Sequence, residues 1–147
     1  MITYDVLAFQ SNANAAASQN IIEDGNNGVL VTGPKKLAQR FILELMTEKG
    51  SITYRPTRGT YFVTEAKAAQ LNNEIDVYTS FSLALLDMSN NLIGEESVND
   101  PSNERYKNAE IQSISVRPGS ITIGVKVVSL AGTFTNISIP LAFNLKN

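Results

Sequence analysis

The 147-residue chain contains no cysteine and no histidine. Without these residues it can form no disulfide, no zinc site built from Cys or His, no thiol nucleophile and no triad with an imidazole base. The lack of disulfides suits a reducing compartment. Only carboxylates, lysine, tyrosine and hydroxyl groups are left for chemistry. We therefore expect a protein that is not an enzyme and that uses no cofactor or metal.

Positive charge and long apolar runs are also scarce. The net charge is -2, so the basic surface typical of nucleic-acid-binding proteins is not expected. Residues 1–5 have no basic stretch before an apolar one and do not resemble a signal peptide. The apolar run from Leu83 to Leu86 is far shorter than the roughly 20 residues that span a bilayer. We expect neither a nucleic-acid partner nor a membrane partner.

The chain does contain enough apolar material for one core. Hydrophobic residues make up 43% of it, and this length suits a single domain over residues 1–147. Residues 10–28 are rich in Asn, Ala, Ser and Gly without periodicity, which predicts an extended loop or arm. The polar segment 94–109, with Pro101, predicts a loop or insertion.

A first helix is clearly indicated at residues 34–49. Pro34 stands in its first turn, where a missing N–H costs nothing, and Gly50 follows its end. Apolar residues recur on one face at helical spacing. On the other face we expect the charged residues to be mostly solvent-exposed: Lys35, Lys36, Arg40, Glu44 and Glu48.

A second helical zone is predicted from residue 64 to residue 91, with a break at Asn72-Asn73. Its expected apolar stripe is Ile75, Tyr78, Phe81, Leu85, Met88 and Leu92. Elsewhere in the first two thirds, β formers predict strands at residues 2–9 and 28–31. Residues 51–63 predict extended chain.

The C-terminal third predicts a β-meander. Its strands are expected at residues 111–116, 121–127 and 136–145, and its turns at Arg117–Ser120 and Ala131-Gly132. Pro140 cannot donate to a ladder, so the last strand should lie at a sheet edge. The expected fold is α+β, with helices packed on a mostly antiparallel sheet with a C-terminal β-meander.

Two patterns carry a superficial chemical motif. Residues 28–35 resemble a phosphate-binding loop, but Pro34 removes a donor and Lys36 stands where the motif needs a hydroxyl. A strand followed by a helix is the simpler interpretation. The carboxylates are scattered, and we expect a solvated surface rather than a paired acid site: Glu44, Glu48, Glu95 and Glu96.

Two segments predict contacts with other proteins. Tyr and Arg near residues 54–62 are residue types enriched at protein interfaces, although base stacking or an ordinary core and surface are alternatives. A terminal strand at a sheet edge invites strand addition; an edge kept monomeric by its proline and a covering loop is the alternative. The candidate contact residues are Gln39, Arg40, Tyr54, Arg55, Arg58, Thr135, Asn136, Ser138 and Pro140.

A family resemblance is carried by residues 31–60. They read VTGPKKLAQRF, then LMTEKGS, then PTRGT. This resembles the baseplate wedge, or sheath-initiator, family of contractile phage tails. That family typically shows a helix carrying Gln and ending Leu-x-Thr-x-x-Gly, a Pro-x-x-Gly segment, further helix and a C-terminal β-meander. One departure is that Asn108-Ala109-Glu110 stands where members usually carry Glu-Pro-Arg before the first meander strand.

The resemblance implies a structural subunit of the virion, made in the host cytoplasm and located at the tail baseplate. It would be present in multiple copies in a symmetric assembly and would have no catalytic activity. Its partners would be the tail sheath protein, which extends an edge of its sheet, and the baseplate wedge and hub or tube proteins. Another tail protein such as a tube or terminator subunit, a regulatory adaptor with the same fold and a carboxylate-dependent hydrolase remain as alternatives.

Overall fold

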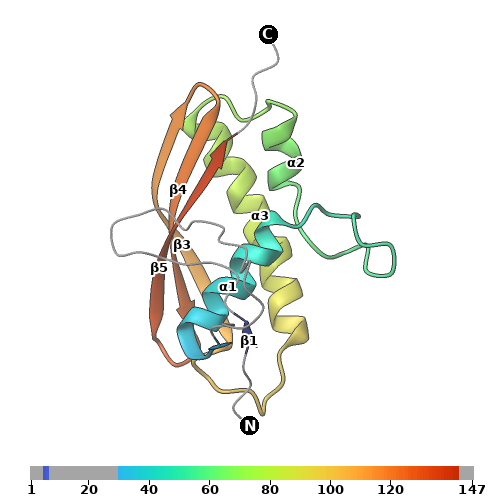
Figure 1. The fold of residues 1–147 in the computed structure, drawn as a ribbon, viewed down its shortest axis with the longest axis vertical. Helices are drawn as coiled ribbons and strands as arrows, with labels where there is room; N and C mark the ends of the chain where they lie inside the picture. Colours follow the sequence, from blue (N-terminus) through green and yellow to red (C-terminus); the bar gives the residue numbers. More distant parts are fainter. Residues whose placement is uncertain (1–4, 7–29, 143–147) are drawn as a thin grey trace.

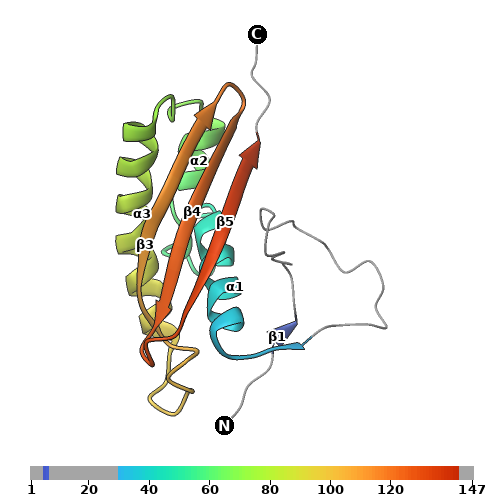
Figure 2. The same cartoon turned by 90° about the vertical axis from the view of Figure 1, so that its left-hand side faces the viewer.

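A computed structural model gives the structure of residues 5–6 and 30–142 (Figure 1). Three helices cover one face of an antiparallel sheet of strand order β3-β4-β5 (Figure 2). The predicted α+β class with a C-terminal β-meander is therefore confirmed. The elements are β1 (Asp5–Val6), β2 (Leu30–Val31), α1 (Gly33–Met46), α2 (Phe62–Lys67), α3 (Glu74–Glu95), β3 (Tyr106–Arg117), β4 (Ser120–Ser129) and β5 (Phe134–Ala142).

Some predictions fall on residues outside this range. The arm at residues 10–28 lies there, as do residues 143–145 of the last predicted strand and most of the first one. Asp5–Val6 is a strand, as predicted, and it pairs antiparallel with Leu30–Val31. The predicted strands near both positions are thus present where the structure describes them.

The core lies between the helices and the inner face of the sheet. Helix α3 packs on β3, α1 packs on β4 and β5, and α2 contacts both other helices. Phe41 of α1, Phe62 of α2 and Phe81 of α3 are fully buried. The Phe62 and Phe81 rings meet edge to face at 5.7 Å, and Phe41 lies 6.4 Å from Phe81. Replacing one such ring by alanine typically costs about 3–5 kcal/mol.

Strands β4 and β5 keep an inward and outward alternation along their length. On β4, Ile121, Ile123, Val125 and Val127 are buried, while the residues between them face outward. Their neighbours on β5 follow the same rule, because Ile123 lies opposite Ile139. No described element covers the outward face of the sheet.

Helix α1 ends at Met46, three residues earlier than predicted. The chain leaves the helix because Thr47 and Lys49 bond Thr60 through the backbone, at 2.9 Å and 3.0 Å. Gly59 makes this approach possible with a φ of 88°, since a Cβ there would lie 2.3 Å from the Thr47 carbonyl oxygen. Residues 52–58 form successive turns, so the prediction of extended chain at 51–63 was wrong.

The break between the second and third helices is confirmed at residues 72–73. Asn73 caps α3 by accepting the Asp76 N–H at 2.9 Å. The predicted apolar stripe was partly wrong, because Ile75 and Tyr78 are 77% and 57% exposed. Phe81, Met88 and Leu92 face the core as predicted, and Leu85 packs partly against it. Val77 and Ala84 also face the core.

The polar segment after α3 is shorter than predicted. Helix α3 continues to Glu95 and β3 begins at Tyr106, so the loop spans residues 96–105. The polar residues Lys107 and Asn108 favour a loop there on sequence alone. In the structure they are exposed residues of β3, beside a register irregularity between Tyr106 and Asn108.

Candidate protein interface

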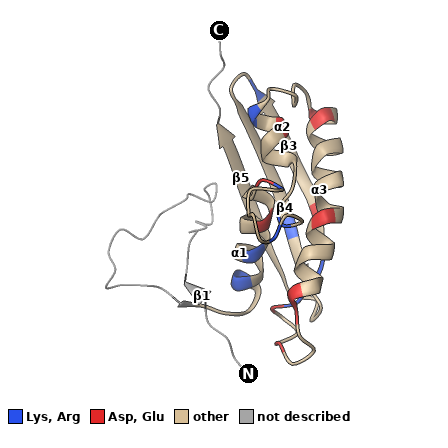
Figure 3. Cartoon of the chain, turned by 90° about the vertical axis from the view of Figure 1, so that its right-hand side faces the viewer, with Lys and Arg blue, Asp and Glu red and all other residues tan. Residues whose placement is uncertain are grey.

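The sheet has two edge strands among the described strands, β3 and β5, since each pairs only with β4. The prediction that the proline-containing strand lies at an edge is confirmed. The two edges differ in what they expose. Strand β3 carries Lys107, Glu110 and Arg117 and has two register irregularities, features that discourage pairing with another chain. Strand β5 has no charged residue and pairs in unbroken register (Figure 3).

The direction of the β5 backbone groups follows from the hairpin that joins it to β4. Ser129 donates its N–H to the Thr133 carbonyl at 2.9 Å. In an antiparallel ladder, hydrogen-bonded pairs alternate with non-hydrogen-bonded pairs. Counting from Ser129, Thr135 and Ile137 fall in hydrogen-bonded pairs. Their N–H and C=O groups are therefore engaged with β4.

The residues between them point their backbone groups away from β4. Asn136 and Ser138 each direct one N–H and one C=O outward, and Pro140 directs only a C=O. These outward groups form the β5 edge. Pro140 is accommodated because β4 does not use the N–H that its ring lacks. Three of the four predicted contact residues in this strand thus lie on the β5 edge, and Thr135 does not.

The side chains around the β5 edge are small or neutral. Asn136 and Pro140 are exposed and Ser138 is half-buried. Ser138 lies opposite Gly124 on β4, which leaves the middle of the outward face flat. At the start of the strand the Lys126 ammonium lies 4.6 Å from the centroid of the Phe134 ring. A second strand can therefore approach the middle of β5 without meeting a charge.

The aromatic and arginine residues at 54–62 do not form one surface cluster. Tyr54 is 86% exposed at the tip of the turns, whereas Phe62 belongs to the core. Arg55 and Arg58 both pair with Glu95 at the end of α3. Tyr54 is accordingly the residue of this segment that is most open to another protein.

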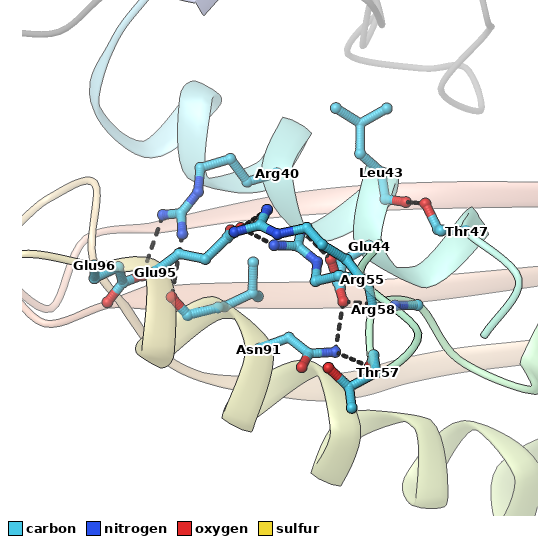
Figure 4. Close-up of polar contacts among 12 residues, drawn as sticks. Arg40, Leu43, Glu44, Thr47, Arg55, Thr57, Arg58, Asn91, Glu95 and Glu96 are labelled. Atoms are coloured by element: carbon cyan, nitrogen blue, oxygen red, sulfur yellow. Dashed lines mark hydrogen bonds and ion pairs between the residues drawn. The ribbon is translucent and has the colours of Figure 1, made fainter. Parts of the chain in front are cut away.

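Glu44 is buried, contrary to the prediction of a solvated position (Figure 4). Its carboxylate accepts the Gly59 N–H at 2.9 Å and the Asn91 side-chain amide at 2.7 Å, and it pairs with the Arg58 guanidinium. Asn91 also donates to the Thr57 carbonyl at 3.0 Å. The Glu44 cluster, which comprises Glu44, Arg58, Gly59 and Asn91, fixes the 51–59 turns to α1 and α3.

A sequence signal for the burial of Glu44 does exist. Leu37, Phe41 and Glu44 stand at i, i+4 and i+7, which is the spacing of one helix face. Leu37 and Phe41 are both buried, so an acid in line with them requires internal partners. Those partners come from residues 58–91, which the helix pattern alone does not identify.

Gln39 and Arg40 of α1 are both mostly withdrawn from solvent. Gln39 is 4% exposed. Arg40 pairs with Glu96 at 3.1 Å and donates to the carbonyls of Glu104 and Leu92 at 3.0 Å and 3.3 Å. These bonds attach α1 to the 96–105 loop. Arg40 therefore links α1 to the end of α3 and to the loop, and the burial of Gln39 leaves little of its side chain exposed.

A cavity of about 410 Å³ lies between α1 and the 96–105 loop. Its three carboxylates already have partners within the chain. Glu104 accepts the Gly33 N–H at 3.0 Å and pairs with Lys36 at 3.2 Å, as expected for an acid at the positive end of a helix. Glu95 and Asp100 are likewise bonded. This arrangement is typical of a structural ion-pair cluster rather than of a catalytic acid pair. The lining residues are Lys36, Arg40, Arg55, Gly94, Glu95, Asp100 and Glu104.

Comparison of the chain with protein-family models, with curated proteins and with solved structures gave no match. Within residues 5–6 and 30–142, no group of three or more acidic, histidine or cysteine side chains is placed to hold a metal ion. None of the described helices combines the length and the apolar character needed to cross a bilayer. The β5 edge is the feature that the geometry distinguishes most clearly.

Proposed function

We propose that this protein is a structural subunit of a contractile phage-tail baseplate and that it templates sheath assembly by accepting a strand on the β5 edge. Two independent observations support the proposal. One is that the edge strand β5 has no charged residue, whereas the other edge strand, β3, carries charges and register irregularities. The other is the resemblance of residues 31–60 to the wedge and sheath-initiator family.

The inequality of the two edges carries the proposal. A monomeric protein protects its edge strands with charges, proline, bulges or short length. Strand β3 has charges and two register irregularities, whereas β5, with nine residues, carries only Pro140. In strand addition the backbone supplies the affinity and alternate side chains supply the specificity. Asn136 and Ser138 would supply both N–H and C=O to the added strand, and Pro140 would supply C=O only.

The 51–59 turns would contact the wedge or hub proteins. Their shape is fixed by the Glu44 cluster, which holds Gly59 and Thr57 against two helices. Tyr54 protrudes from this fixed support, and a tyrosine side chain, with two χ angles, loses little conformational entropy when it binds. The Pro-x-x-Gly element of the resemblance, Pro56 to Gly59, is the part of the segment that the cluster constrains.

The start of β3 bears on one further point of the resemblance, the Glu-Pro-Arg motif that family members usually carry before the first meander strand. Because β3 begins at Tyr106, the residues just before the first meander strand are Glu104 and Arg105. They stand where family members usually carry Glu-Pro-Arg, with no proline between them. Glu104 here bonds the start of α1. We expect any wedge contact at this place to use Arg105 rather than Glu104.

Sedimentation of the purified protein with the sheath protein encoded in the same genome tests the proposal. We expect the protein alone to remain a monomer or small oligomer and to seed sheath polymers when mixed. Ser138→Pro removes an outward N–H that β4 does not use, so this variant should fold and should fail to seed. Ser138→Thr keeps that N–H and is the matched control, which should seed normally.

Two outcomes would contradict the proposal. One is normal seeding by a folded Ser138→Pro variant, which would exclude strand addition at the β5 edge. The other is a closed ring of the purified protein that has no effect on sheath, which would favour a tube or terminator subunit instead.

A further inference from the structure

Helix α3 carries a second apolar face that points away from the core. Five large residues on it are between 53% and 77% exposed. A helix that is apolar on opposite faces is normally buried on both. The residues of this α3 stripe are Ile75, Tyr78, Leu83, Leu86 and Ile93.

The α3 stripe contains no charge. At about 100° per residue its five members fall within about 140° of one another around the helix. The helix carries four acids, and all of them lie outside that sector: Glu74, Asp76, Asp87 and Glu95. The residues between the apolar ones are Thr79, Ser82, Ser89 and Asn90, all of modest size, which lets a second helix approach closely. Burial of this face would therefore leave no unpaired charge.

The stripe is nearly symmetric along the helix. Ile75 and Ile93 stand at equal distances from Ala84, and Leu83 and Leu86 lie close to that centre. At a two-fold interface, if residue i of one copy contacts residue j of the other, then residue j of the first copy contacts residue i of the second. An antiparallel pair of α3 helices satisfies this condition, with Ile75 of each copy against Ile93 of the other and the two leucines at the axis.

The exposed area is sufficient for such a pair. With roughly 200 Å² per large residue, the stripe offers about 600 Å² on each copy, or about 1,200 Å² in total. A specific interface should exceed about 1,000 Å². The largest apolar patch on a typical monomer is about 300–600 Å². The α3 stripe is therefore at the upper limit for a surface that stays exposed.

We infer that the α3 stripe is a dimer interface, at which a second copy of this chain packs its own α3 in antiparallel orientation about a two-fold axis. Helix α3 and strand β5 lie on opposite sides of the molecule (Figure 2). The dimer would therefore leave both β5 edges open. This inference does not depend on the proposed function.

Sedimentation equilibrium of the full chain, alone, tests the dimer. We expect a reversible dimer with a dissociation constant in the micromolar range, as for interfaces of this size. Leu86→Glu should weaken the dimer about tenfold or more, because it buries a charge at the axis. Leu43→Glu is the matched control, since Leu43 is also an exposed helical leucine, 45% exposed and outside the stripe. It should leave the dimer unchanged.

Cysteine cross-linking tests the orientation, and the chain contains no other cysteine. The combined variant Ile75→Cys/Ile93→Cys should form a covalent dimer on oxidation. Ile75→Cys alone should not, because the two positions at residue 75 would lie about 27 Å apart along the helices. A wild-type protein that stays monomeric at high concentration would overturn the inference. So would a dimer that Leu86→Glu does not weaken, or efficient cross-linking of Ile75→Cys alone.

Discussion

Replacing Glu44 by alanine tests whether the Glu44 cluster holds the 51–59 turns. The change removes the acceptor for the Gly59 N–H and the Asn91 amide and one partner of Arg58. Removing one partner from a buried ion pair costs about 3–5 kcal/mol. Arg58 keeps its contact with Glu95, and Asn91 keeps its bond to Thr57. We therefore expect a loss of about 2–4 kcal/mol in the free energy of unfolding.

Glu48→Ala is the matched control. Glu48 is four residues after Glu44, and it pairs at the surface with Lys67, whose side chain is 66% exposed. An exposed pair of this kind contributes between 0 and about 1 kcal/mol. Urea unfolding followed by circular dichroism gives both values from the midpoints, provided that the m-value is unchanged.

A double-mutant cycle with Arg58→Ala gives the strength of the pair itself. We expect a coupling energy of about 1 kcal/mol or more, since Glu44 is buried. If Glu44→Ala cost no more than Glu48→Ala, the Glu44 cluster would not be what fixes the turns. The proposal that the Glu44 cluster supports Tyr54 at the tip of the turns would then be wrong.

Three further predictions follow from the backbone and from burial. Gly59→Ala should cost about 2 kcal/mol or more in thermal unfolding, because the φ is positive and the Thr47 carbonyl occupies the space of a Cβ. Thr135→Pro should lower the free energy of unfolding by about 3 kcal/mol or more and Ser138→Pro by clearly less, because only the first change removes a hydrogen bond to β4. Equal losses of stability in urea unfolding would refute the assigned direction of the β5 backbone groups. Burial raises the pKa of the Tyr106 phenol. Its stabilising contribution is therefore complete below a pH of about 10 and is lost as the pH rises through the folded-state pKa. The free energy of unfolding should decline less steeply in Tyr106→Phe over that range.

The sheet could be predicted well from the sequence because its signal is local. Alternation from Ile121 to Val127 and again after Asn136 fixes which side chains face the core. Pro140 identifies the edge strand, since a strand paired on both sides has no place for it. Both conclusions need only the period of the strand and the chemistry of one residue.

The helical region was harder because its residues depend on distant partners. Helix α3 is apolar on two faces, so periodicity alone did not show that Ile75 and Tyr78 point outward. Glu44 looked like a surface acid because its partners, Arg58, Gly59 and Asn91, lie further along the chain. The turns at 51–59 likewise depend on these tertiary bonds and not on local propensity.

Amide hydrogen exchange of β5, in the free protein and in the sheath-seeded assembly, tests whether the β5 edge accepts an added strand. In the free protein we expect the Thr135 and Ile137 amides to exchange slowly and the Asn136 and Ser138 amides to exchange fast. In the assembly all four should be protected, because an added strand would bond the two outward amides. Asn136 and Ser138 amides that exchange equally fast in both states would contradict strand addition at the β5 edge.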